Sequence, residues 1–370
     1  MTEKIRIAVV GAGHLGRFHA RLLAANTDFQ LIGVVDPDAE ARKALAEELH
    51  VKGVDSHRAL LDEIDAAVIA TPTEHHHQIG MELLLRGKHL LVEKPLAGNL
   101  SEADALTECA TAGNRILQVG HIERFNPALL AVQDKIEQPK FIEACRCSGY
   151  SFRSTDIGVV LDLMIHDVDI VLNLINAKPI RIDAVGTCVL GPQEDVANAR
   201  IVFDDGCIAN LSASRVSYEA VRKMQVWCPQ AFLAIDYANA TAKVTRPSDA
   251  LLRGDCDVRR LSLTEKQRAK ERFFDEWLSV EQFAPESSNA LEDELRDFSE
   301  AIQHERLPQV TGAAGRDAVA VCEQILESIA HHAWDAHPHS GIGPHGMQQP
   351  DTIPVPPVEI TAPIPRRRAG

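Results

Sequence analysis

The first 120 residues of the chain alternate short, almost wholly apolar runs with stretches of helical periodicity. Near-continuous apolar strands separated by helices are typical of βαβ units and of a parallel sheet buried on both faces. This order indicates a doubly wound α/β domain, the Rossmann arrangement, over residues 1–120. The predicted strands are 5–10, 31–36, 66–71, 89–93 and 116–120, and the predicted helices are 14–25, 38–49, 74–86 and 101–111.

From about residue 140 the pattern changes, because strand-like runs follow one another without helices between them. Such a succession indicates an antiparallel or mixed sheet. We therefore expect residues 121–334 to form a C-terminal α+β domain with a large open sheet of mixed or antiparallel strands. The strand-like runs are 180–190, 198–203, 207–215, 223–228, 231–237 and 242–245, and helical patterns cover 159–175, 265–274, 291–302 and 321–329.

The last segment, residues 335–370, is rich in proline and glycine and contains three consecutive arginines near its end. Such a segment cannot bury enough apolar surface to offset the entropy lost on ordering. We expect a disordered tail, or an arm that lies on a partner subunit.

The charge balance excludes some partners. The 370 residues include 38 Lys and Arg against 53 Asp and Glu, a net charge of −15. Nucleic acids and anionic membranes both require a basic surface, so we expect neither as a partner. No apolar run reaches the ~18 residues of a membrane span, and the N-terminus lacks the pattern of a secretory signal. A cytoplasmic location is therefore predicted.

Two side-chain clusters suggest a metal ion, and neither has a suitable spacing. The eight cysteines contain no CxxC pair, and the closest two, Cys145 and Cys147, lie on an apparent strand where we expect them to point to opposite faces. His75, His76 and His77 open a predicted helix, on which neighbouring side chains diverge by about 100°. We therefore expect reduced thiols and no metal site.

A glycine-rich motif lies between the first predicted strand and the first predicted helix. Gly11 permits a tight turn, Gly13 lets backbone amides approach a pyrophosphate, and Gly16 allows close packing of helix on strand. The amides and dipole at the helix start hold the phosphate charge. The motif predicts a dinucleotide site made by Gly11, Ala12, Gly13, His14, Leu15 and Gly16.

Asp36 ends the second predicted strand, 20 residues after the last glycine of the motif. A carboxylate there accepts hydrogen bonds from ribose hydroxyls and repels a 2′-phosphate, so NAD is preferred to NADP. Arg42 is the nearest later basic residue, and we expect it to lie too far along the helix to reverse this preference.

Glu93-Lys94-Pro95 follows the fourth predicted strand, and ligands bind at the carboxyl ends of such strands. A lysine placed there can hydrogen-bond a substrate hydroxyl or polarise a carbonyl. The alternative is an ordinary surface Lys–Glu pair.

Asp162, His166 and Asp169 are spaced so that they share one face of a helix that is otherwise apolar almost all round. Such a helix is usually buried, and buried ionisable groups need a partner or a chemical task. A satisfied core His–Asp pair is the alternative to a catalytic role.

Taken together, these motifs resemble the Gfo/Idh/MocA family of sugar and cyclitol dehydrogenases, over about residues 4–334. The resemblance implies that Lys94 and His166 carry the catalysis with Asp162 nearby, that NAD is the cofactor, and that the open sheet joins subunits into a homodimer or homotetramer. Further cofactor contacts would come from Thr71, Pro72, His76, Glu93 and Lys94, with His76 near the nicotinamide ribose.

Residues 119–127 and 153–167 resemble the branch of this family that oxidises the 3-hydroxyl of UDP-N-acetylglucosamine for a lipid A sugar. Arg124 and Arg153 could then meet a diphosphate bidentately. Glu123 and Asn126 could bind sugar hydroxyls, and Asp156, Asp162 and His166 would complete the substrate site. The alternative for the two arginines is salt bridging with Glu123 and Asp156.

The sequence thus predicts an NAD-dependent oxidoreductase in which His166 accepts the proton of a secondary hydroxyl and Lys94 hydrogen-bonds the same oxygen. A free sugar, a sugar acid or an inositol is an alternative substrate, and an NAD-recycling glycosidase is an alternative activity. A non-catalytic NAD-binding regulator is a further alternative, which the presence of both Lys94 and His166 disfavours.

Overall fold

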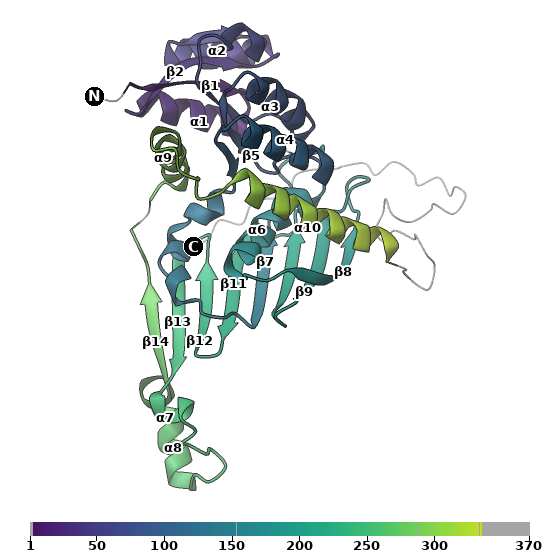
Figure 1. The fold of residues 1–370 in the computed structure, drawn as a ribbon. Helices are drawn as coiled ribbons and strands as arrows, with labels where there is room; N and C mark the ends of the chain where they lie inside the picture. The colour runs from purple at the N-terminus through teal and green to yellow at the C-terminus, as the bar shows by residue number, and fades with distance from the viewer. Residues whose placement is uncertain (1–2, 153, 287, 333, 335–370) are drawn as a thin grey trace, which may run out of the picture.

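A computed structural model of the chain describes residues 3–152, 154–286, 288–332 and 334, and the predicted tail lies outside them. It contains a six-stranded sheet and an eight-stranded sheet, each with helices packed against it (Figure 1). The predicted fold class is confirmed: a doubly wound parallel sheet is followed by an α+β part with a large mixed sheet.

The first sheet has the strand order β3-β2-β1-β4-β5-β6, and all its neighbouring strands are parallel. Because the strand order reverses between β1 and β4, a crevice forms at their carboxyl ends. The strands are β1 (Ile5–Val10), β2 (Phe29–Val35), β3 (Lys52–Val54), β4 (Ala66–Ile69), β5 (His89–Glu93) and β6 (Leu117–Gly120), and the helices are α1 (His14–Ala25), α2 (Ala39–Leu49), α3 (His76–Leu85) and α4 (Leu100–Ala112).

The second sheet has the order β14-β13-β12-β11-β7-β10-β9-β8, in which β7 and β10 are parallel and all other neighbours antiparallel. Its strands are β7 (Phe141–Cys147), β8 (Pro179–Thr187), β9 (Val196–Phe203), β10 (Ile208–Ser214), β11 (Val221–Cys228), β12 (Ala231–Asp236), β13 (Thr241–Pro247) and β14 (Leu278–Phe283). Its helices are α5 (Pro127–Leu130), α6 (Ile165–Leu174), α7 (Asp249–Leu252), α8 (Leu263–Glu271) and α10 (Gly312–His331), of which α6 and α10 lie along one face (Figure 1).

The expectation for Cys145 and Cys147 is wrong. Residues two apart on a strand point to the same face, because side chains alternate with a period of two. In β7 the two sulfur atoms lie 3.6 Å apart, and both side chains are half-buried.

Helix α9 (Ala290–Gln303) follows the second sheet in sequence but packs against the first. Its Leu295 and Phe298 are fully buried in the same apolar cluster as Ile7 and Val34, and the Phe298 ring stacks on Phe29 at 6.3 Å. The chain therefore returns to the first sheet after completing the second (Figure 1).

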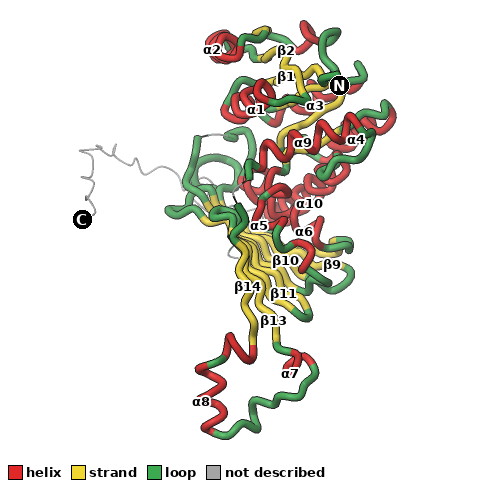
Figure 2. Tube along the Cα trace, turned by 90° about the vertical axis from the view of Figure 1, so that its left-hand side faces the viewer, coloured by secondary structure: helices red, strands yellow, loops and turns green. Residues whose placement is uncertain are grey.

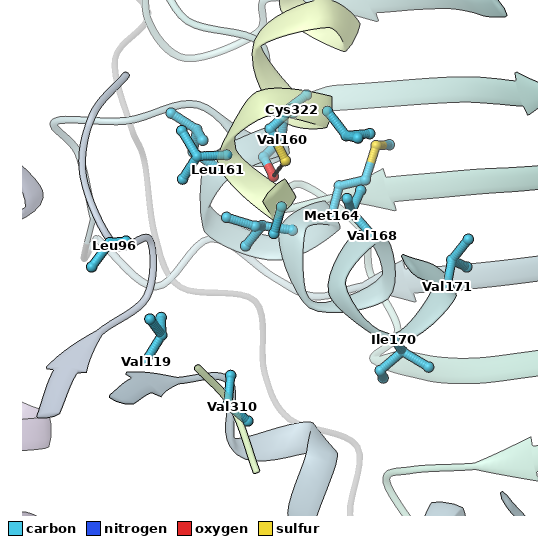
Figure 3. Packing of buried hydrophobic residues seen from close by; sticks show 14 of the residues in the cluster. Leu96, Val119, Val160, Leu161, Met164, Val168, Ile170, Val171, Val310 and Cys322 are labelled. Atoms are coloured by element: carbon cyan, nitrogen blue, oxygen red, sulfur yellow. Dashed lines mark hydrogen bonds between the residues drawn. The ribbon is translucent and has the colours of Figure 1, made fainter. Parts of the chain in front are cut away.

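One apolar cluster continues from the first sheet into the second part of the molecule (Figure 3). Val119 of β6 contacts α10 so closely that a side chain on Gly315 would lie 2.5 Å from it. Val168 packs into the same cluster from α6, and Met164 packs into it from the turn before α6. Because this core is shared, it fixes the position of α6 relative to the ends of β5 and β6.

A hairpin extension between β13 and β14 carries α7 and α8 beyond the end of the sheet (Figure 2). Neither short helix buries a side chain. Among the helices of the described ranges, none has the length and apolar composition needed to cross a bilayer.

Candidate active site

The loop between β1 and α1 is shaped by its three glycines. Gly11 has φ +106°, and a side chain on it would lie 2.4 Å from the Ala70 carbonyl oxygen. A side chain on Gly16 would lie 1.8 Å from the Gly11 carbonyl oxygen, so only glycine allows this packing. A side chain on Gly13 would meet nothing within 4 Å, which leaves open space in front of the loop.

The start of α1 fits an anionic group. The helix has no side-chain cap and no acidic residue in its first turn, so its first amides lack an anionic partner within the helix. Free amides and the positive end of the helix dipole together bind phosphate. His14 and Leu15 are exposed at this helix start, beside the space in front of Gly13.

Asp36 follows β2 and lies beside the glycine loop. Its carboxylate accepts hydrogen bonds from the Ala12 amide at 2.6 Å and from the Asp38 amide at 2.8 Å. This position of Asp36 beside the glycine loop agrees with the predicted hydrogen bonds from its carboxylate to a ribose. Arg42 lies nearer to Asp36 than expected, because its guanidinium turns back and donates to the Asp36 carbonyl oxygen at 2.6 Å. That Arg42 does not reverse the preference for NAD stays a prediction.

Lys94 is the first residue after β5, and its peptide bond to Pro95 is cis. Its ammonium group donates to the carbonyl oxygen of Asp162 at 2.5 Å and to the Asp162 carboxylate at 3.0 Å. The Lys94 and Asp162 side chains are 13% and 15% exposed. Two of the three predicted catalytic side chains therefore meet at the junction of the two sheets.

The prediction of one helical face for Asp162, His166 and Asp169 is wrong for Asp169. Its carboxylate accepts two hydrogen bonds from the Arg124 guanidinium, at 2.7 and 3.3 Å, in the protein interior. The reason is the wide π-helical turn over Val160–Met164, which precedes α6. Across such a turn the spacing of a regular α-helix no longer holds.

His166 lies in the first turn of α6 and is half-buried. Its Nδ1 is buried without a hydrogen-bond partner among the described residues. Burial lowers the pKa of His166 well below its ordinary value, and the nearby cations Lys94 and Arg146 lower that pKa further. The ring is therefore neutral near pH 7 and retains a lone pair that can accept a proton.

His76 and Glu93, two of the predicted cofactor contacts, form hydrogen bonds within the protein. His76 is buried, with its ring nitrogens 2.8 Å from the Pro95 carbonyl and 2.9 Å from the Thr71 carbonyl. Burial also lowers the pKa of His76. Glu93 points away from Lys94 and bonds His19 at 2.8 Å. Both side chains stabilise the loops at the carboxyl ends of the strands. Thr71 is partly exposed there, and Pro72 is exposed.

The region 121–127 also differs from the prediction, because its polar side chains turn inward. Glu123 is buried and accepts a hydrogen bond from Arg146 at 2.6 Å. Arg124 is buried with Asp169 as its partner, so the predicted diphosphate contact is withdrawn. Asn126 caps α5 and contacts Glu123. The side chains of all three residues thus bond partners within the protein.

Of the remaining predicted substrate residues, Arg153 lies outside the described residues. Asp156 is exposed, and its carboxylate accepts a hydrogen bond from the Thr73 amide at 3.1 Å. This contact joins the loop before α6 to the turn after β4. Asp156 therefore lies beside the carboxyl end of β4.

Two further residues at the site were missed by the sequence analysis. His121 follows β6, and the pairing of Glu93 with Gly120 makes it the neighbour of Lys94 at the sheet edge. Its ring contacts the His166 ring edge-on, with centroids 6.2 Å apart. Arg222 lies opposite Arg146 in the register of β11 and β7, so both point to the face covered by α6. Their positions at strand ends could have drawn attention to both.

Comparison with known proteins decides the family. Residues 5–121 match the profile of an oxidoreductase family with an NAD-binding Rossmann fold, and residues 146–233 match the Gfo/Idh/MocA C-terminal domain. The chain belongs to the Gfo/Idh/MocA family. The predicted cofactor, NAD, and the predicted class, oxidoreductase, are confirmed by this match.

Several members of the Gfo/Idh/MocA family are similar over most of their length. UDP-N-acetylglucosamine 3-dehydrogenase of Acidithiobacillus ferrooxidans is 35% identical over 88% of this chain and 97% of its own. A solved structure of that protein has a TM-score of 0.77 at 34% identity, covering 89% of this chain and 98% of its own. The NAD-dependent scyllo-inositol 2-dehydrogenase of Bacillus subtilis is 30% identical over 59% of this chain and 69% of its own.

Replacing Gly13 with alanine is expected to weaken NAD binding about tenfold or more. Stability should fall by at most about 1 kcal/mol, because alanine caps the start of α1 less well than glycine. The added methyl group has room in the protein itself, since nothing lies within 4 Å of its position. It would occupy the space that the pyrophosphate needs. Calorimetric titration with NAD measures the affinity, and thermal unfolding without NAD measures the stability. Gly149→Ala is the control, because a methyl group there would meet only the Ser217 carbonyl oxygen, at an ordinary contact distance of 3.7 Å. Equal NAD affinity in the two variants would contradict this role of Gly13.

Proposed function

We propose that this family member oxidises a secondary hydroxyl of a nucleotide sugar with NAD, and that the hydroxyl is the 3-hydroxyl of UDP-N-acetylglucosamine. The observation that carries the proposal is the 35% identity to a UDP-N-acetylglucosamine 3-dehydrogenase over 97% of that protein's length. The pairing of Lys94 with Asp162 beside the neutral His166 supports a hydroxyl-oxidising site.

When bound, NAD supplies the hydride acceptor for the oxidation. Gly11, Gly13, Gly16 and Asp36 would hold it, since the loop leaves space for the pyrophosphate. His166 takes up the hydroxyl proton at Nε2, because its Nδ1 is buried. Lys94 donates a hydrogen bond to the same oxygen and stabilises the negative charge that develops there. Asp162 holds the Lys94 ammonium group in position.

A UDP-sugar also requires a cation for its diphosphate. Because Arg124 is engaged by Asp169, we assign this contact to Arg222. Arg222 is exposed, has no ion-pair partner among the described residues, and is close enough to lower the pKa of His166. Its guanidinium can bind two phosphate oxygens at once.

The test is the absorbance of NADH when the enzyme and NAD meet a panel of substrates. We expect turnover with UDP-N-acetylglucosamine and none with free N-acetylglucosamine, because the free sugar lacks the diphosphate. The panel also includes UDP-glucose, UDP-N-acetylglucosaminuronic acid and an inositol. Turnover of the inositol or the free sugar alone would overturn the nucleotide-sugar assignment.

The same assay tests the diphosphate contact in the variant Arg222→Met. Its KM for the UDP-sugar should rise about tenfold or more, the loss expected when a charged hydrogen bond to phosphate is removed. Arg181→Met, at an exposed arginine near the start of β8, is the matched control. An unchanged KM in Arg222→Met would contradict the diphosphate contact.

A further inference from the structure

Three ring nitrogens at the site are buried without a hydrogen-bond partner among the described residues. They are Nδ1 of His166 and both nitrogens of His121. An unsatisfied buried polar group costs about 1–3 kcal/mol, so native structures rarely retain several in one place. His121 is only 1% exposed, so bulk water does not satisfy its ring.

The two rings are already in contact, and the fold holds them there. His121 is fixed by the end of β6, and His166 by the first turn of α6. Their planes are nearly perpendicular, at 88°, with an edge-to-face contact. For a nitrogen of His121 to bond Nδ1 of His166, the two rings must turn and also move closer together, and no other group of the described residues bonds that Nδ1 atom.

We propose that His121 is a positioning residue, which accepts a hydrogen bond from the Nδ1–H group of His166 when the cleft closes on its ligands. This bond fixes the His166 tautomer that carries its proton on Nδ1 and keeps the lone pair on Nε2. The inference rests on the proposed function, because it assigns the orientation of the base used there. A general base needs this lone pair at the atom that faces the substrate.

The charges around the pair explain why the base needs such a partner. When His166 takes up the hydroxyl proton, its ring becomes an imidazolium in a buried place. The charged groups that act most strongly on His166 are cations, whereas those that act on His121 are two carboxylates and two cations. A hydrogen bond from Nδ1–H to His121 moves positive charge toward those carboxylates and stabilises the protonated base. The charged neighbours of His166 are Lys94, Arg146 and Arg222, and those of His121 are Asp169, Glu93, Arg124 and Lys94.

The tautomer of His166 can be observed without turnover. Long-range nitrogen NMR of the holoenzyme, labelled at histidine nitrogens and held with NADH and UDP-N-acetylglucosamine, distinguishes Nδ1–H from Nε2–H rings. The His166 signal is assigned by its loss in His166→Gln. We expect the Nδ1–H tautomer in the wild-type protein and a mixture of tautomers in His121→Phe, which keeps a buried ring without nitrogens.

Kinetics give an independent readout. His121→Phe should lower kcat about 10²-fold, within the range of a misoriented general base, and leave the KM for NAD unchanged. The acid limb of its pH profile for kcat should move to lower pH. Losing the His121 acceptor destabilises the protonated His166 ring and so lowers the pKa of His166. His121→Asn and His121→Gln each keep an oxygen that can accept the bond, so one of them should recover much of kcat.

The two proposals fail separately. An Nε2–H ring in the wild-type complex, or a His121→Phe enzyme with unchanged kcat and pH profile, would overturn the role of His121. A protein with the Nδ1–H tautomer that turns over no UDP-sugar would overturn the proposed substrate alone.

Discussion

Replacing Lys94 with methionine is expected to lower kcat about 10³-fold while NAD still binds. The methionine retains the length and most of the volume of the side chain but lacks the ammonium group. That group lies 3.0 Å from the Asp162 carboxylate at the edge of the cleft. Without it, the oxygen that loses its proton has no cationic donor. Steady-state formation of NADH measures the loss, and calorimetric titration measures NAD binding.

Lys88 provides a matched control for Lys94. It precedes β5, whereas Lys94 follows it, so the two lysines lie at opposite ends of one strand. The Lys88 ammonium donates to the Ile64 carbonyl oxygen at 2.7 Å, away from the cleft. Lys88→Met should keep the wild-type kcat. If Lys94→Met kept a tenth or more of the wild-type kcat, Lys94 would not be the donor.

Replacing Arg146 with methionine is expected to lower the free energy of unfolding by about 3–5 kcal/mol. Arg146 is buried in β7 between two carboxylates, with Asp167 at 2.8 Å and Glu123 at 2.6 Å. Removing the guanidinium leaves both carboxylates in the interior without a counter-charge. Urea unfolding followed by circular dichroism measures the difference from the wild-type protein.

Two comparisons separate this effect from a simple loss of volume. Arg200→Met, at an exposed arginine of β9, should change stability little. Burial already raises the pKa of Asp167, and without Arg146 this carboxylate would bind a proton still more readily when folded than when unfolded. The loss of unfolding free energy in Arg146→Met, relative to the wild-type protein, should therefore become smaller as the pH falls from about 7 to about 5. A loss independent of pH would contradict the charge argument.

The sequence predicted the strands of the first sheet because both faces of that sheet are buried. Nearly continuous apolar runs such as Ile5–Val10, interrupted only by Arg6, result from this burial, and they can be recognised without knowing the partner strands. The prediction missed β3, which has only three residues and is mostly exposed. It also missed the edge strand β14, whose four central residues are all exposed.

Lys94 and His166 could be singled out because each is a charged or titratable residue placed against an apolar element. The direction of a side chain near them could not be predicted in the same way. Arg124 and Glu123 have the chemistry of ligand-binding residues, but their partners, Asp169 and Arg146, are more than 20 positions away in the sequence. Pairing at that distance depends on the tertiary fold.

The π-helical turn over Val160–Met164 likewise made the direction of the Asp169 side chain unpredictable from the sequence. Regular helical spacing places Asp169 with Asp162, and one wide turn is enough to separate their roles. His121 was missed for a different reason. It lies within residues 119–127, but ligand binding in that stretch was predicted for the charged and amide side chains that follow it. Only the register between β5 and β6 places His121 beside Lys94.

The return of α9 to the first sheet also restricts how such a gene can evolve. Leu295 and Phe298 complete a core that is otherwise built from the first third of the chain, including Phe29. A recombination that exchanged residues 1–120 for those of another enzyme would set these side chains against a foreign surface. The cofactor half and the substrate half of this chain are therefore inherited together, and new substrates are more readily acquired through changes in the cleft than through exchange of modules.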